Sequence, residues 1–67
     1  MERTNLKLLR VKNKMTQAEF AALIGCNRLT YAAIENGVRT GRNIFWRSLE
    51  RLFPNENITE LMKVDEN

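Results

Sequence analysis

The stretch that decides the fold is Gln17 to Asn36, QAEFAALIGCNRLTYAAIEN. Apolar residues recur in it at helical spacing on either side of a single glycine, Gly25. They are Phe20, Ala21 and Ile24 before the glycine, and Tyr31 and Ile34 after it. Apolar residues three or four positions apart share one face of a helix. The stretch therefore predicts two short helices joined by a tight turn, each with one buried face.

The second of these helices, expected over residues 28–35, leaves its other face free. Helical periodicity turns Arg28, Leu29, Ala32 and Ala33 away from the buried stripe. Two short helices joined by a tight turn, the second with a free face, have the geometry of a helix-turn-helix. In that motif the second helix lies in the major groove of DNA.

Capping signals place five helices along the chain, at about residues 5–12, 17–24, 28–35, 44–53 and 58–63. Thr16 and Glu19 have the spacing of a capping box, with Met15 and Phe20 as its hydrophobic staple. The other expected N-caps are Thr4 or Asn5, Asn27, Asn43 and Asn57. Gly37 is expected to end the third helix in a left-handed conformation, and Pro54 to close the fourth.

Apolar stripes outside the central stretch predict the rest of the core. The expected inward residues are Leu6 and Leu9, broadened by Leu8 and Val11, then Phe45, Leu49 and Leu52, and finally Ile58, Leu61 and Met62. The predicted fold is all-α, a compact five-helix arrangement with a central helix-turn-helix.

Length and composition indicate one domain over residues 1–67. A chain of this length buries only about 60% of its unfolded surface. One cysteine and no histidine exclude an internal disulfide and a Cys/His zinc site, and no cofactor is expected. No pattern for nucleophilic or acid–base catalysis is present, so an enzyme is not expected. With no signal peptide or apolar run long enough for a membrane span, we expect a cytoplasmic protein. The chain ends soon after the fifth helix, so no further domain is expected to follow.

Charge is distributed unevenly along the chain. Residues 1–47 hold nine Lys/Arg and three Asp/Glu, a balance of +6, and residues 48–67 hold two and five, a balance of −3. A basic N-terminal part of this kind is typical of a protein that binds a polyanion.

The segment TQAEFAALIGCNRLTYAAIENG, residues 16–37, resembles the phage repressor and Cro type of helix-turn-helix, the XRE-like bacterial regulators. The likeness extends over about residues 5–62. Ala21 matches a position where two helices cross closely, Gly25 permits the turn, and Cys26 takes the small apolar position after it. The resemblance implies that Arg10 and Glu35 pair inside the domain and tie the first helix to the third.

The free face of the third helix carries the expected base contacts. Arg28 is the best candidate, because arginine donates two parallel hydrogen bonds to guanine. Leu29 and Ala33 can meet thymine methyl groups, and small Ala32 lets the helix sit deep in the groove. With one long polar side chain on this face, specificity can also depend on DNA shape.

Backbone contacts are expected at the start of the second helix and around the two ends of the third. Gln17 begins a helix, where free amides attract phosphate, and the resemblance also implies that it braces the first base-reading residue. The remaining expected backbone contacts are Asn27, Thr30, Asn36, Arg39, Thr40, Arg42 and Asn43.

Two aromatic residues have alternative interpretations. Tyr31 either lies in the core with its hydroxyl at the rim, which is the interpretation we favour, or contacts DNA. Trp46 either covers the edge of the core or lies in a dimer interface, whose candidates are Trp46, Ile58, Leu61 and Met62.

The sequence thus predicts a sequence-specific regulator of transcription that binds double-stranded DNA as a homodimer on a palindromic operator. A Cro-like or repressor protein of a phage, prophage or mobile element fits best. An antitoxin or a restriction-modification controller of the same fold stays open, as does a protein-interaction module that has lost DNA binding.

Overall fold

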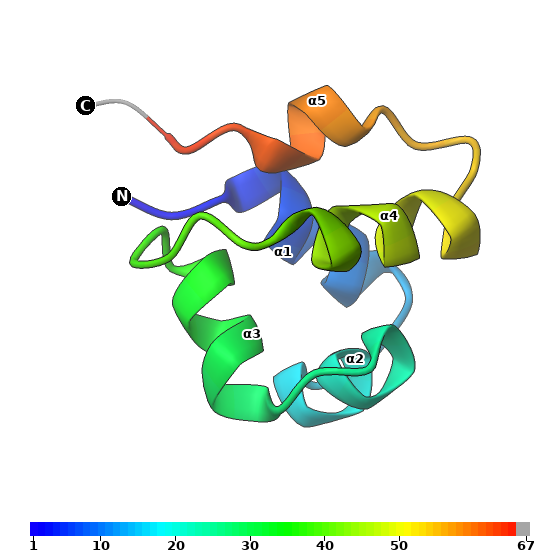
Figure 1. Ribbon diagram of the computed structural model, residues 1–67, viewed down its shortest axis with the longest axis horizontal. Helices are drawn as coiled ribbons and strands as arrows, with labels where there is room; N and C mark the ends of the chain where they lie inside the picture. Colours follow the sequence, from blue (N-terminus) through cyan, green and yellow to red (C-terminus); the bar gives the residue numbers. More distant parts are fainter. Residues whose placement is uncertain (66–67) are drawn as a thin grey trace.

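The computed structural model describes residues 1–65, which form five helices (Figure 1). The helices are α1 (Thr4–Lys12), α2 (Gln17–Ile24), α3 (Arg28–Glu35), α4 (Asn43–Leu52) and α5 (Ile58–Met62). In Figure 1, α2 and α3 occupy the lower half of the view and α4 and α5 the upper half. The all-α fold predicted from the sequence is therefore confirmed. No helix of the described chain has the length and apolar character that crossing a bilayer requires.

One core joins all five helices. α2 packs against α3 and α4, and α1 packs against α5 and α3. The largest side chains that are fully buried are Leu6, Phe20, Tyr31, Ile34 and Leu49. Phe20 and Tyr31 meet edge to face, with 5.4 Å between their ring centroids, a geometry that aromatic pairs prefer. Ala21 is also buried, as the close packing of α2 on α3 requires.

The helix-turn-helix segment folds as its capping signals predict. The hydroxyl of Thr16 accepts a hydrogen bond from the amide of Glu19 at 3.1 Å, and the Glu19 carboxylate accepts one from the amide of Thr16 at 2.9 Å. Asn27 caps α3 by accepting from the amide of Thr30 at 2.8 Å. Gly25 and Gly37 are left-handed, with φ of 100° and 81°. The predicted bounds of α2 and α3 are confirmed.

Two predicted caps are wrong. α1 begins at Thr4, and the side chains of Thr4 and Asn5 bond instead to the Asp65 carboxylate and the Glu60 carbonyl. Both side chains thus join the start of α1 to the other end of the chain, remote in sequence. α4 begins one residue earlier than expected, so Asn43 lies inside the helix and Arg42 is its N-cap, without a side-chain capping bond. The caps at Asn27 and Asn57 are confirmed.

Four residues expected to face inward are exposed instead: Leu8, Val11, Leu52 and Met62. α1 advances about 100° per residue, which sets Leu8 about 130° and Val11 about 170° around the helix axis from the midpoint of buried Leu6 and Leu9. At Leu52 and Met62 the helices end, and fewer neighbours remain to cover the side chains. The stripe on α4 is instead completed by Trp46, which is buried together with Phe45 and Leu49.

Candidate nucleic-acid interface

One face of α3 lies at the surface of the domain and is most exposed at the start of the helix. Arg28 and Leu29 are exposed, and Ala32 and Ala33 are half-buried. The opposite face is buried through Tyr31, Ile34 and Glu35. The structure therefore places all four residues predicted to contact bases outside the core.

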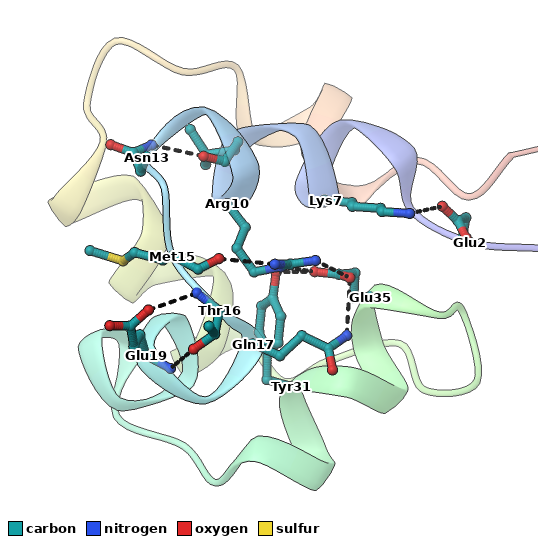
Figure 2. Close-up of polar contacts among 11 residues, drawn as sticks. Glu2, Lys7, Arg10, Asn13, Met15, Thr16, Gln17, Glu19, Tyr31 and Glu35 are labelled. Carbon is teal, nitrogen blue, oxygen red and sulfur yellow. Dashed lines mark hydrogen bonds and ion pairs between the residues drawn. The ribbon is translucent and has the colours of Figure 1, made fainter.

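The buried side of α3 is fixed by the carboxylate of Glu35, which gathers four hydrogen bonds (Figure 2). Its Oε2 accepts from Arg10 Nε at 2.8 Å and from the Tyr31 hydroxyl at 2.5 Å. Its Oε1 accepts from Arg10 Nη2 at 3.2 Å and from Gln17 Nε2 at 3.1 Å. The pairing of Arg10 with Glu35 that the resemblance implied is thus present. α1, α2 and α3 meet at one buried charge.

The protonation of this cluster follows from its hydrogen bonds. Burial alone would raise the pKa of Glu35, but the bonds from Arg10, Tyr31 and Gln17 hold it below its usual value. The hydrogen bond from Arg10 to Glu35 raises the pKa of Arg10. The pKa of Tyr31 is raised mainly by burial and, to a lesser extent, by the neighbouring Glu35 carboxylate. Glu35 is therefore ionised at neutral pH, and the guanidinium of Arg10 compensates its charge.

Two sequence expectations change at this cluster. The hydroxyl of Tyr31 does not reach the rim, because it donates to Glu35 in the interior. The side-chain amide of Gln17 is engaged with Glu35 rather than with Arg28, so in the free protein it braces the buried charge and not the first base-reading residue. Gln17 nevertheless begins α2, where the free backbone amides of a helix N-terminus point outward.

The residues predicted to contact the DNA backbone lie at the two ends of α3. Asn36, Arg39, Thr40, Arg42 and Asn43 are all exposed. We call residues 38–42 the arginine loop. The amides of Val38 and Arg39 both donate to the Ala33 carbonyl, at 2.8 and 3.1 Å, which ties the loop to the end of α3. At the other end, Asn27 and Thr30 are held together by the helix cap.

A hollow of about 740 Å³ separates the arginine loop from the turn between α2 and α3. Arg39, Arg42 and Thr30 line it, together with Cys26 and exposed Ile44. Cys26 is partly buried and packs against the core, and this burial raises the pKa of its thiol. The hollow gives the face around α3 a concave, basic side.

A family model described as helix-turn-helix matches residues 6–44, more than half of the chain. The chain belongs to the helix-turn-helix family. This match confirms the resemblance to the phage repressor and Cro type and makes the protein a DNA-binding helix-turn-helix regulator. Searches of curated proteins and of solved structures each gave no match.

In this helix-turn-helix protein, two of the four candidate dimer contacts are buried. Trp46 is 6% exposed and Leu61 3% exposed, so both belong to the core of a single copy. They fill space between α4, α5 and the rest of the domain, which leaves little surface for a partner. Met62 is exposed and Ile58 is half-buried, and these two remain available for contact with a second copy.

Sequence reasoning missed Arg3. The residue precedes the first helix and is 5% exposed, whereas a lone arginine near a chain end is ordinarily a surface residue. No local signal marks Arg3, because its burial comes from contacts with residues 31 to 59 positions away in the chain. Two exposed apolar residues also lie here, Val38 in the arginine loop and Ile44 two positions after it.

Proposed function

We propose that this protein is a sequence-specific transcriptional regulator of the Cro or repressor kind, acting in the bacterial cytoplasm. It binds an operator of a phage, prophage or mobile element and acts sterically on polymerase. The observation that carries the proposal is the exposed face of α3, which begins with Arg28. The buried side of the same helix is held by the hydrogen bonds of Arg10 and Tyr31 to Glu35. A rigid helix with an exposed arginine in its first turn fits the major groove.

The contacts divide into two classes. Arg28 reads guanine, while Leu29, Ala32 and Ala33 fit against methyl groups or allow a close approach. The backbone contacts come from Gln17 through the N-terminus of α2, from Asn27 and Thr30, and from Asn36, Arg39, Thr40, Arg42 and Asn43. The first class provides discrimination between sequences, and the second provides affinity and register.

One recognition helix reads few base pairs, so we propose that two copies bind together. Their two α3 helices would then lie about 34 Å apart on a palindromic site, one turn of the duplex. The exposed apolar residue Met62, with half-buried Ile58, supports a contact between copies along α5.

A pair of alanine variants tests the division of contacts. Arg28→Ala should lose about 1–3 kcal/mol of discrimination between operator and random duplex while retaining general binding. Arg42→Ala should weaken binding to all duplexes alike and lower the slope of log K against log salt by about 0.9. Anisotropy titrations of labelled duplexes over a range of salt concentrations measure both quantities. The operator comes first from selection of bound sequences out of a random duplex pool.

Equal effects of the two variants on both duplexes would contradict the division between reading and anchoring residues. A wild-type protein that binds no duplex at low salt would reject DNA binding itself. It would favour a protein-interaction module instead.

A further inference from the structure

Arg3 is a buried cation whose partners are backbone carbonyls. Its Nε donates to the Met62 carbonyl at 3.0 Å, and its Nη1 donates to the carbonyls of Ile34 at 2.5 Å and Arg39 at 2.8 Å. Its own amide donates to the Glu35 carbonyl at 2.7 Å. One residue thus joins the N-terminal segment to the end of α3, to the arginine loop and to the end of α5.

The chemistry of these acceptors explains why a charge is tolerated there. The last carbonyls of a helix lack intrahelical partners and carry the negative end of the helix dipole. Arg3 reaches such carbonyls at the ends of both α3 and α5. Its guanidinium also lies over the ring of Trp46, 5.7 Å from the centroid, where the ring face attracts cations. Burial lowers the pKa of Arg3, yet arginine keeps its proton under all ordinary conditions.

The N-terminal segment lies directly on the turn that leads into the arginine loop. A Cβ atom on Gly37 would come within 1.9 Å of the Met1 carbonyl oxygen, so the two backbones are in close contact. On its other side, the segment receives a hydrogen bond from the amide of Asp65 to the Glu2 carbonyl at 2.8 Å. Figure 1 shows the N-terminal segment, in blue, between the red segment that follows α5 and the green loop that follows α3.

The backbone of the arginine loop is held at two neighbouring carbonyls. The guanidinium of Arg3 donates to the carbonyl of Arg39, and the indole N–H of Trp46 donates to the carbonyl of Thr40 at 3.2 Å. The side chains of Arg39, Thr40 and Arg42 remain exposed. Arg3 and Trp46 therefore fix the loop from inside and leave its outer surface available.

We propose that Arg3 is a positioning residue for DNA binding: it fixes the arginine loop so that Arg39 and Arg42 meet the sugar-phosphate chain. This inference rests on the proposed function of the loop. Arg3 itself does not touch DNA. A loop that is already ordered loses less conformational entropy when it binds, so preorganisation by Arg3 increases affinity for every duplex.

A double-mutant cycle tests the proposal. Arg3→Met removes the guanidinium, and Lys12→Met is the matched control, because it removes one charge from an exposed pair with Glu56. Arg3→Met should weaken binding to any duplex about tenfold more than Lys12→Met does. In a background carrying Arg39→Ala and Arg42→Ala, whose carbonyls are unchanged, the effect of Arg3→Met should fall below about twofold. An equal effect in both backgrounds would overturn the proposal.

A second measurement follows the loop without DNA. Amide hydrogen exchange of residues 38–42 should become faster in Arg3→Met, while exchange in the interior of α2 should be unchanged. Unchanged exchange in the loop would overturn the proposal. If Arg3→Met does not fold, Arg3→Lys replaces it in the cycle, because one ammonium nitrogen cannot take the place of Nε on the Met62 carbonyl and of Nη1 on the Ile34 and Arg39 carbonyls.

The outcomes separate this inference from the proposed function. If the wild type binds duplexes and Arg3→Met binds them equally well, only the role of Arg3 is rejected. No binding by the wild type rejects the proposed function and the inference with it. Binding that is indifferent to Arg39→Ala and Arg42→Ala rejects the loop as the route.

Discussion

Glu35 shows how one residue can connect the fold to the DNA-binding face. Its carboxylate is buried and accepts hydrogen bonds from side chains of three helices. Removing one partner of a buried ion pair leaves an uncompensated charge, which costs about 3–5 kcal/mol. For a domain of this size that is a large fraction of the total stability. The orientation of α3 therefore depends on a charge that is buried behind its exposed face.

The lowered pKa of Glu35 predicts a loss of stability in acid. Because the folded state favours the ionised carboxylate, its contribution is complete above about pH 4.5, the ordinary value, and declines as the pH falls through the lower folded value. Glu35→Gln should be less stable by about 3 kcal/mol at pH 7 and show a shallower decline between about pH 5 and 3. Urea unfolding at a series of pH values measures this free energy.

The control for this prediction is Glu50→Gln, which removes an exposed carboxylate of α4. This substitution should leave the decline of the free energy of unfolding in acid unchanged. A Glu35→Gln profile parallel to that of the wild type would contradict the assignment of the acid sensitivity to Glu35.

At the scale of elements, α2 and α3 could be predicted from the sequence because their signals are local. Thr16 and Asn27 cap the helices that directly follow them, and Gly25 and Gly37 supply the left-handed conformations between and after them. The start of α1 could not be predicted this way. Thr4 and Asn5 bond to Asp65 and Glu60, which lie about sixty residues away in the chain.

The same distinction holds for the candidate site. The outward face of α3 follows from helical period alone, so the exposed positions of Arg28 and Leu29 could be predicted. The bond between Gln17 and Glu35 and the burial of Arg3 arise from tertiary contacts. A short sequence pattern carries no information about them. The resemblance to a family provided the pair of Arg10 and Glu35, which spacing could not.

The capping box of α2 gives a prediction at this scale. Thr16→Ala removes the hydroxyl that accepts from the Glu19 amide, and an N-cap of this kind is worth about 1 kcal/mol. The melting temperature should fall by about 4–8 °C for a domain of this size. Calorimetry measures the change. Thr59→Ala, at an exposed helical position in α5, is the matched control and should change stability by less than about 0.5 kcal/mol. Equal shifts in the two variants would argue against the capping box.

At the scale of the whole molecule, the two ends of the chain and the end of α3 form one connected region. The Asp65 amide bonds to the Glu2 carbonyl, and Arg3 bonds to the carbonyls of Ile34 and Met62. The end of α5, where a second copy is proposed to bind, is thus joined through Arg3 to the arginine loop. Contact between copies and contact with phosphate are expected to involve neighbouring parts of the structure.

The last prediction concerns the pair of copies on DNA. Met62 is 44% exposed at the end of α5, and Met62→Glu would place a charge in the proposed contact, where burial without a partner is costly. Binding to a palindrome with half-sites one turn apart should lose its cooperativity, whereas binding to a single half-site should be unchanged.

Val11→Glu, at an exposed apolar position of α1, is the matched control. Insertion of about five base pairs between the half-sites rotates one copy by half a turn, and it should abolish cooperativity in the wild type as well. Titrations of the three duplexes with each variant measure the effect. Cooperative binding that persists in Met62→Glu would place the contact between copies elsewhere than α5.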